Sequence, residues 1–326
     1  NLYLIPNQVK AGERLCANSF ADLVFFGNSG AEACEGVIKV ARKYHAHHGH
    51  PEKYRMVTVE GAFHGRTLAT IAAGGNAKHL DGFGPAVEGF DQVPFGNMNA
   101  LRDAITGETA GVMIEPVQGE GGIRPMDLEY LRDVRKACDE FGILMCVDEV
   151  QCGIGRTGKL FAHEWAGVKP DVLAAAKGLG GGVPVGAVLA TNEAAAGMVA
   201  GTHGSTYGGN PLSTAAVNAV LDVVLEDGFL AKVIETGDYL RAECDKLIAK
   251  YPNVFSSVRG AGLMLGLVAV PPNGDVVAAA TENGMLTVPA GDNVVRLIPP
   301  LTIGNTEVDE AIAILDKTAA SMAPAQ

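Results

Sequence analysis

Short apolar segments alternate with helix-like segments along most of the chain, and this alternation restricts the fold more than any other feature. Strand-like runs occur in DLVFFGN, RMVTVEG, AGVMIEP, GILMCVDEVQ and DVLAAAKG. Helical spacing of apolar residues follows the first of them, behind Ser29 and Gly30, and recurs near residues 127–141. Strands that alternate with helices predict a mostly parallel sheet covered by helices on both faces, the α/β class.

The C-terminal part of the chain follows a different order. A long helical pattern runs from residue 211 to 251 with a break at Asp227 and Gly228. Two strand-rich segments, VFSSVRGAGLMLGLVAV and GDNVVRLIPPL, then precede a final helical pattern at 306–320. Strands that are grouped apart from the alternating units predict a separate, small α+β domain. We therefore expect a large domain over residues 1–225 and a small C-terminal domain over residues 226–326.

The overall charge argues against two classes of partner. The chain has 326 residues, with 37 acidic and 25 basic side chains and a formal net charge of −12. A negative protein repels phosphate backbones and anionic lipid surfaces, so we expect neither a nucleic acid nor a membrane as partner. No apolar run approaches the roughly 20 residues of a membrane span. The six cysteines form no CxxC pair, which favours a reducing compartment, the cytoplasm.

The carboxyl ends of the expected strands are the place to look for a site, because ligands of open α/β sheets bind outside those ends. One end carries Lys177, which follows the apolar run VLAAA, residues 172–176, and precedes the glycine-rich GLGGG. An amine among apolar residues and glycines loses solvation, which favours its neutral, nucleophilic form. Lys177 is therefore a candidate for Schiff-base chemistry, although a lysine that caps a strand and reaches water has a similar sequence context.

Two further strand ends complete a pattern that is typical of one cofactor. Asp148 follows the apolar GILMCV, and Ser29, Gly30 and Ala31 begin a helix after DLVFFGN. Pyridoxal 5'-phosphate needs a lysine for its aldehyde, a carboxylate for its ring nitrogen and an anion site for its phosphate. Free N–H groups at a helix start suit a phosphate. The sequence therefore predicts a pyridoxal phosphate site at this edge of the sheet.

Two arginines and one loop add candidate substrate contacts. Arg66 follows AFHG, and Arg296 lies within the apolar VVRLIPP, where a positive charge needs a partner. A guanidinium binds a carboxylate through two parallel hydrogen bonds, so either arginine suits the carboxylate of an amino acid. Glu120 is a candidate partner for Arg296 when no substrate is bound. The loop HGSTYGGN offers the hydroxyls of Ser205 and Thr206 as a second candidate anion site.

Two other motifs point to different sites, with less support. GIGRTG, residues 153–158, matches the dinucleotide pattern G-x-G-x-x-G, but DEVQC separates it from the preceding strand, and no acidic residue stands about 20 positions on after a second strand. YHAHHGH, residues 44–50, holds four histidines at a helix end, which is typical of a solvated surface rather than a metal site. We expect no metal site, and we expect His64 to pack near a ring.

Six motifs, taken in order, resemble the class III, ornithine-type, pyridoxal phosphate aminotransferases: FFGNSGAEA, FHGRT, IEPVQGEGG, VDEVQCGIGRTG, AAAKGLGGGVPVGA and HGSTYGGNPL. The resemblance covers the chain from end to end. It implies fold type I of the pyridoxal phosphate transferases and a homodimer whose active sites lie between the subunits. It also implies transfer of an amino group from N-acetylornithine to 2-oxoglutarate, which yields N-acetylglutamate 5-semialdehyde and glutamate in arginine biosynthesis.

The resemblance also implies how the candidate residues hold the cofactor. Lys177 would bind its aldehyde and move the proton, and Asp148 would hold its ring nitrogen. The other implied contacts surround the ring and the phosphate: Gln151 at the ring hydroxyl, Phe63 on the ring face, and Gly30, Ala31 and the other subunit's Thr206 at the phosphate.

The implied substrate contacts form a second set. Arg66 and Ser205 would contact the acetylornithine side of the substrate. Arg296 would bind the α-carboxylate of glutamate or 2-oxoglutarate, in exchange with Glu120. The family generally carries a further N-terminal segment that helps to cover the site, so we expect the present sequence to be a shortened form.

The strand-end residues leave several alternatives open. Ornithine, 4-aminobutyrate, succinylornithine and succinyldiaminopimelate are alternative amino donors within the same fold. An aminomutase would need no external 2-oxoglutarate, and the pairing of Arg296 with Glu120 argues against it. A nicotinamide oxidoreductase depends only on GIGRTG, and a structural protein would not need Lys177, Asp148 and Arg296 together.

Overall fold

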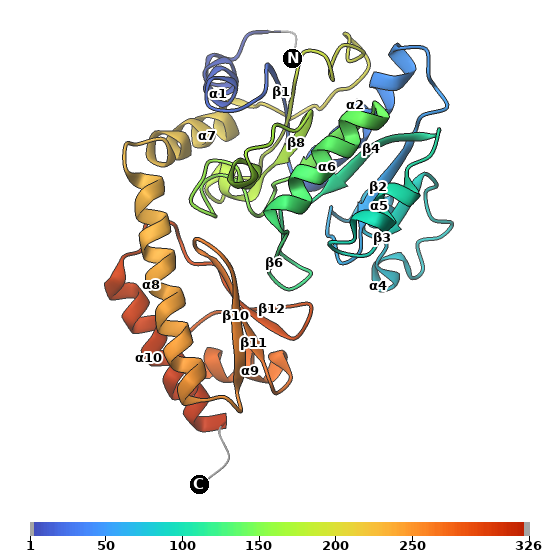
Figure 1. Ribbon diagram of the computed structural model, residues 1–326. Helices are drawn as coiled ribbons and strands as arrows, with labels where there is room; N and C mark the ends of the chain where they lie inside the picture. The colour runs from blue at the N-terminus through green and yellow to red at the C-terminus, as the bar shows by residue number, and fades with distance from the viewer. Residues whose placement is uncertain (1–2, 323–326) are drawn as a thin grey trace.

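The computed structural model describes residues 3–322, and Figure 1 shows that they form a larger and a smaller part. The larger part holds a seven-stranded sheet with its helices, and the smaller part holds the C-terminal strands and helices. Residues 1–2 and 323–326, where the predicted large domain begins and the predicted small domain ends, lie outside the described residues.

The strands of the large sheet have the order β1-β9-β8-β7-β4-β2-β3. From β8 to β3 neighbouring strands are parallel, as the sequence predicts. β9 is antiparallel to both β1 and β8, a reversal that is not expected from the alternation of strands and helices. The strands are β1 Leu23–Gly27, β2 Arg55–Val59, β3 Phe90–Val93, β4 Thr109–Ile114, β7 Leu144–Asp148, β8 Val172–Ala175 and β9 Gly186–Ala190.

Helices and short elements surround this sheet. The helices are α1 Pro6–Ala17, α2 Gly30–His47, α3 Leu68–Gly74, α4 Ala77–Leu80, α5 Met98–Ala104, α6 Leu128–Phe141 and α7 Pro211–Val224. Two 3-10 turns, η1 Ala162–Ala166 and η2 Lys177–Gly180, and a two-stranded ribbon of β5 Val117–Gln118 and β6 Arg124–Pro125 complete the larger part.

Two apolar clusters lie on the two faces of the large sheet. Val134 of α6 belongs to one cluster together with Val112 of β4. Val37 of α2 belongs to the other cluster together with Met113, the next residue of β4. Successive side chains of a strand point to opposite faces, so α6 and α2 cover opposite faces of the sheet. This confirms the predicted α/β architecture and buries the central strands on both sides.

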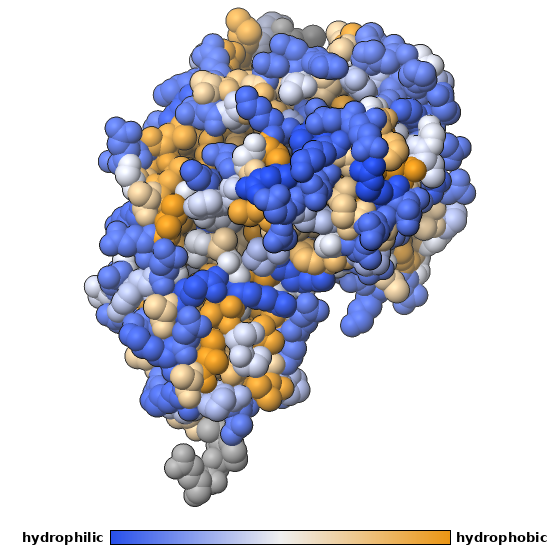
Figure 2. Space-filling model, viewed as in Figure 1, coloured by the Kyte–Doolittle hydropathy of each residue, from blue (hydrophilic) through white to orange (hydrophobic). Residues whose placement is uncertain are grey.

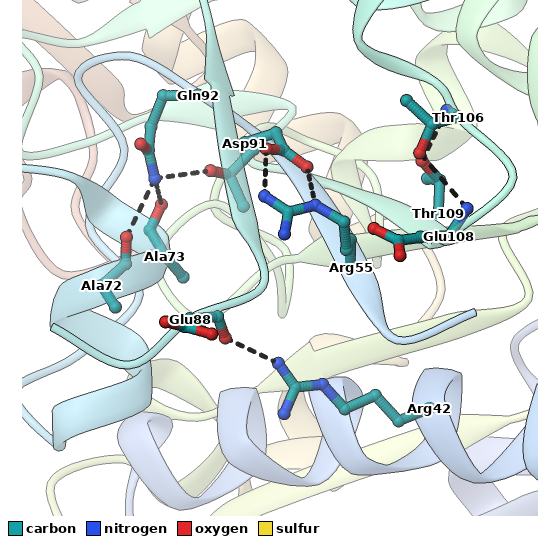
Figure 3. Close-up of polar contacts among 11 residues, drawn as sticks. Arg42, Arg55, Ala72, Ala73, Glu88, Asp91, Gln92, Thr106, Glu108 and Thr109 are labelled. Carbon is teal, nitrogen blue, oxygen red and sulfur yellow. Dashed lines mark hydrogen bonds and ion pairs between the residues drawn. The ribbon is translucent and has the colours of Figure 1, made fainter. Parts of the chain in front are cut away.

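The edge strand β3 is attached to its neighbours by polar side chains (Figure 3). Arg55 of β2 donates two hydrogen bonds to Asp91 of β3, from Nε to Oδ2 at 2.8 Å and from Nη2 to Oδ1 at 2.5 Å. Gln92 Nε2 donates to the carbonyl oxygen of Ala72 in α3 at 2.9 Å. These bonds supplement the single ladder of an edge strand, which has only one strand neighbour.

The smaller part is built around a separate antiparallel sheet with the order β10-β11-β13-β12. One apolar cluster joins this sheet to the helices of the smaller part. The predicted small α+β unit is therefore present, while the boundary between residues 225 and 226 stays a prediction. Its elements are α8 Phe229–Lys250, β10 Phe255–Ala261, β11 Met264–Ala269, α9 Asn273–Glu282, β12 Val288–Ala290, β13 Val294–Leu297 and α10 Asn305–Met322.

The break between helices α7 and α8 has a local cause. Gly228 precedes α8 with a φ of 85°, in the left-handed region that glycine adopts without strain.

Hydrophobic residues gather on the surface over α7 and the start of α8 (Figure 2), where Leu212 and Val223 of α7 are exposed. None of the helices in residues 3–322 has the length and apolar character of a membrane span.

Candidate active site

A cavity of about 440 Å³ opens at the carboxyl ends of the parallel strands. It lies beside the ends of β1, β7 and β8 and beside the loop that follows β2. Such an edge is the usual ligand position in open α/β sheets. Six of the residues that are predicted to contact the cofactor or substrate line the cavity: Gly30, Ala31, Phe63, Arg66, Asp148 and Lys177.

Asp148 is the buried carboxylate of this cavity, at the end of β7. Its Oδ2 lies 2.7 Å from Nδ1 of His64 and accepts a hydrogen bond from Sγ of Cys34 at 3.2 Å. Its Oδ1 accepts the backbone N–H of Val150 at 2.9 Å. A buried carboxylate needs such partners because an unpaired charge in the interior is costly. The side chain is thereby fixed in one orientation at the cavity wall.

His64 supports Asp148 and has one ring nitrogen left over. Burial lowers the pKa of His64, but the hydrogen bond and charge of Asp148 and the charge of Glu115 outweigh it and leave this pKa raised. Nε2 of His64 is buried and has no hydrogen-bond partner among residues 3–322. The sequence predicts only packing near a ring for this residue. Its contact with Asp148 is a finding of the structure.

The start of α2 is the candidate anion site. Oγ of Ser29 accepts the N–H of Glu32 at 3.2 Å, while the first N–H groups of a helix, here those of Gly30 and Ala31, have no carbonyl partner inside it. Gly186 of β9 packs directly against this turn. A side-chain carbon at Gly186 would lie only 2.1 Å from the carbonyl oxygen of Ser29, so the turn requires glycine there.

Gly65 brings the loop after β2 close to α2. Its φ of 131° is unfavourable for other residues, and a side-chain carbon there would lie 2.7 Å from Cβ of Ala31. The loop presents Phe63 and Arg66 to the cavity, with the Arg66 guanidinium 5.4 Å from the centre of the Phe63 ring. An aromatic face and a cation therefore lie on the same side of the cavity.

Lys177 follows β8 in a strained backbone conformation. Its φ is 46°, in the left-handed region that residues with a side chain adopt at a cost. Such strain is concentrated at functional sites. Lys177 lines the cavity together with Asp148, but it is exposed in the single chain. The desolvation predicted for this amine is therefore not supplied by residues 3–322 of one chain, which corrects the expectation from the apolar and glycine-rich sequence around it.

Arg296 approaches from β13 of the small sheet and is 6% exposed. Its Nη1 and Nη2 contact Glu120 Oε1 at 2.5 Å and Oε2 at 3.1 Å. Burial raises the pKa of Glu120, but the hydrogen bond and charge of Arg296, with help from Gln151 and Lys177, lower it below its usual value. The predicted pairing of Arg296 with Glu120 is thus present in the structure.

Gln151 joins this pair rather than the cavity lining. Its Oε1 accepts from Nη1 of Arg296 at 3.2 Å, and its Nε2 donates to Oε1 of Glu120 at 3.2 Å.

The loop at 203–210 also lies beside the lining rather than within it. Ser205 Oγ accepts a hydrogen bond from Nδ2 of Asn28, a lining residue, at 3.1 Å. Thr206 is exposed. The cofactor and substrate contacts predicted for these residues stay predictions.

The GIGRTG loop has a structural use that differs from nucleotide binding. Nη1 of Arg156 donates to the carbonyl oxygens of Leu263 at 3.0 Å and Pro299 at 2.6 Å, both in the smaller part. Burial lowers the pKa of Arg156 to about 10. Gly158 packs against Ile234 of α8, where a side-chain carbon would approach within 2.3 Å. The loop therefore joins the two parts of the molecule.

The comparisons with known proteins agree with this geometry. The family model "Aminotransferase class-III" matches residues 1–319. The chain is a class III aminotransferase. Acetylornithine aminotransferase of Brucella melitensis is 61% identical over 312 residues, which cover 96% of this chain and 77% of the relative.

Solved structures show the same fold. N-acetylornithine aminotransferase from Stenotrophomonas maltophilia has a TM-score of 0.85 at 35% identity, covering 99% of this aminotransferase and 81% of that chain. Ornithine aminotransferase from Toxoplasma gondii, described with partial occupancy of pyridoxal phosphate at its active site, has a TM-score of 0.91 at 30% identity, covering 96% and 76%. The aminotransferase therefore has the fold type I architecture predicted from its sequence, and it depends on pyridoxal phosphate as its family does.

The cavity of this aminotransferase fits the cofactor. It combines a primary amine, a buried carboxylate, a helix start with free N–H groups and the side chain of Phe63. The unpartnered buried nitrogen of His64 is a further sign that a polar group belongs near this wall. The contacts of Cys34, His64 and Glu115 with the residues of the site were not predicted from the sequence, because they depend on tertiary packing.

Proposed function

We propose that this aminotransferase transfers the amino group of N-acetylornithine to 2-oxoglutarate, forming N-acetylglutamate 5-semialdehyde and glutamate in arginine biosynthesis. The proposal depends mainly on the ion pair between buried Arg296 and half-buried Glu120, which lies beside the Lys177 cavity. A substrate with a second carboxylate can displace Glu120 from the guanidinium, and a substrate without one can leave the pair closed. The name of the Brucella melitensis relative supports the acetylated donor.

The proposed cofactor contacts follow the cavity. Bound pyridoxal phosphate would supply an aldehyde and an electron-accepting ring. Lys177 would hold the aldehyde and would move a proton at the carbon that carries the transferred amino group, which is Cδ in N-acetylornithine and Cα in glutamate. Asp148, oriented by His64, would face the ring nitrogen. The remaining contacts are Phe63 on the ring, Gln151 at the ring hydroxyl, and Gly30 and Ala31 at the phosphate.

The proposed substrate contacts lie on either side of Lys177. Arg66 and Ser205 would bind the acetylornithine side, since Arg66 lines the cavity and Ser205 bonds to the lining residue Asn28. Arg296 would bind the α-carboxylate of glutamate or 2-oxoglutarate after Glu120 has moved away. These groups would orient the donor so that Cδ, which carries the transferred amino group, lies within reach of the amine of Lys177.

We further propose a homodimer in the cytoplasm. Lys177 is exposed in the single chain, so a second subunit would supply the missing cover. Tyr207 and Leu212, which are 73% and 72% exposed, flank the loop end that would bring Thr206 to the phosphate of the partner subunit. Exposed apolar residues around a functional loop are typical of an interface. The six cysteines are free, as is usual in a reducing compartment.

An absorption spectrum tests the function. The protein loaded with pyridoxal phosphate should show the visible band of a lysine-bound cofactor, which N-acetylornithine bleaches and 2-oxoglutarate restores. Lys177→Ala should lack the band. Lys159→Ala is the matched control, since its amine lies over the Trp165 ring, outside the cavity, and its spectrum should be normal.

Donor comparison completes the test. Ornithine, 4-aminobutyrate and succinyldiaminopimelate should bleach the band more slowly than N-acetylornithine. A faster reaction with one of them would move the proposal to that donor. Turnover without any added keto acid would indicate an aminomutase, and a missing band after cofactor addition would refute the cofactor role of Lys177.

A further inference from the structure

Glu115 is a buried carboxylate that the proposed chemistry does not use. It follows β4 directly, at the carboxyl end of this central strand, and is 4% exposed. β4 pairs with β2 on one side and with β7 on the other. The side chain therefore lies between the strand that leads to the Phe63 loop and the strand that ends at Asp148.

The carboxylate binds two loops that are distant in sequence. Its Oε1 accepts the backbone N–H of Phe63 at 2.8 Å, and its Oε2 accepts the backbone N–H of Gly119 at 3.3 Å. Phe63 lines the cavity, and Gly119 immediately precedes Glu120, the partner of Arg296. One side chain thus binds the backbone of a cavity-lining residue and the backbone next to Glu120.

We propose that Glu115 is a positioning residue that couples the seating of the cofactor to the exchange of Glu120 at Arg296. This inference depends on the proposed function. With both bonds intact, Phe63 is held at the cavity wall and Glu120 is held in register with Arg296. Loss of one bond loosens the cofactor contact and at the same time weakens Glu120 as a competitor for the guanidinium.

Burial and the neighbouring charges shift the pKa of Glu115. Burial, followed by the negative charge of Asp148, raises the pKa of Glu115 to about 7, while His64 and the two backbone N–H groups oppose the rise. The thiols of Cys34 and Cys152 also face it and have pKa values well above their usual range, so they stay neutral. The ionised carboxylate offers a strong acceptor oxygen to each of the two N–H groups, whereas protonation turns one of these oxygens into a hydroxyl, which is a weaker acceptor.

Glu115→Gln tests the coupling, because the amide keeps one acceptor oxygen and turns an N–H₂ group toward the other backbone N–H. We expect the Kd for pyridoxal phosphate, measured by titration of the apoprotein, to rise about tenfold. We also expect the KM for 2-oxoglutarate to fall at least about threefold, because Glu120 competes less well for Arg296. A general packing defect would raise both constants.

The matched control is Glu164→Gln. Glu164 also accepts a backbone N–H, that of Phe161 at 2.7 Å, but it lies outside the cavity lining. Both constants should stay within about twofold of the wild type in this variant. If Glu115→Gln does not fold, Glu115→Asp replaces it, because the shortened side chain keeps the charge and cannot reach both loops.

A double variant separates coupling from simple support. In a Glu120→Gln background, Glu115→Gln should leave the KM for 2-oxoglutarate unchanged and should still raise the Kd for the cofactor. Unchanged constants with a lower Tm, or a parallel rise of both constants, would overturn the proposal. A wild-type protein that forms no lysine-bound cofactor band would instead refute the proposed function.

Discussion

Glu120 and Arg296 form a two-pronged ion pair between the loop that follows β5 and strand β13 of the small sheet. Gln151 forms a hydrogen bond with each of the two residues. Because the guanidinium is already paired, a substrate carboxylate that binds Arg296, as we propose, would have to replace Glu120 rather than fill an open site. In the proposed function the ion pair would therefore set the relative affinity of the site for substrates with and without a second carboxylate.

Glu120→Gln should lower the KM for 2-oxoglutarate and glutamate by several fold, because the amide competes less strongly than a carboxylate for Arg296. The KM for N-acetylornithine should fall less or rise, so the ratio of the two constants changes. Steady-state kinetics with each substrate varied in turn measures this ratio.

The control for this prediction is Glu140→Gln, which breaks the exposed ion pair between Glu140 and Arg102. It should leave both constants unchanged, because exposed pairs contribute little. A Glu120→Gln enzyme with the wild-type KM ratio would contradict the assignment of Glu120 as the competitor.

Asp148→Asn should reduce kcat by about 10²-fold or more, a loss in the range of general acid–base contributions. The amide has nearly the same shape but cannot hold a protonated ring nitrogen as a carboxylate does, and it also weakens the contact with His64. Single-turnover bleaching by N-acetylornithine measures the chemical step directly.

Asp171→Asn is the corresponding control. Asp171 accepts the N–H of Met145 at 2.7 Å and pairs with Arg135, just before the start of β8 and away from the cavity. We expect it to lower Tm without slowing the bleaching step. Equal rates for Asp148→Asn and the wild type would remove Asp148 from the mechanism.

Gly186→Ala should destabilise the protein by about 1–3 kcal/mol and weaken cofactor binding, because the added methyl group overlaps the Ser29 carbonyl. Gly12→Ala, in the interior of α1 with no atom within 4 Å of the new carbon, should instead stabilise by about 0.5–1 kcal/mol. Urea unfolding of the apoprotein and cofactor titration measure the two effects. Normal cofactor affinity in Gly186→Ala would show that the α2 turn is not the phosphate site.

The raised pKa of Glu115 predicts a pH dependence of stability. A carboxyl group that has a higher pKa in the folded than in the unfolded state stabilises folding at low pH, and this contribution is lost as pH rises. For Glu115 the loss should extend from about pH 4.5 to about 7. Urea unfolding of the apoprotein at pH 5 and pH 8 should show a smaller decrease for Glu115→Gln than for the wild type.

Position along a strand carried most of the predictable information about the site. Lys177, Asp148 and the start of α2 could be found because each follows an apolar run, and parallel strands bring such ends together. The contact between His64 and Asp148 could not be predicted, since it joins residues 84 positions apart through the packing of two loops. The hydrogen bonds of Gln151 to Glu120 and Arg296 could not be predicted either, because the sequence of a loop does not determine which residues its side chains contact.

The fold shows a similar division. Alternation predicts β2, β4, β7 and β8 and the helices that cover them, since burial on both faces needs long apolar runs. The direction of β9 was not predictable, because a short apolar run such as GAVLA reads the same for parallel and antiparallel strands. Direction is set by the connection from η2 and by pairing with β1 and β8.

The antiparallel strand β9 also imposes an order on the formation of the sheet during synthesis. β1 pairs within the large sheet only with β9, and Leu23 has Ala190 as its register partner. During translation β1 therefore leaves the ribosome long before β9 has been synthesised. Until then the backbone of β1 has no partner in the large sheet. The helix start that follows β1 is consequently completed late, and a nascent chain that ends before residue 186 lacks the glycine that packs against Ser29 at the proposed phosphate site.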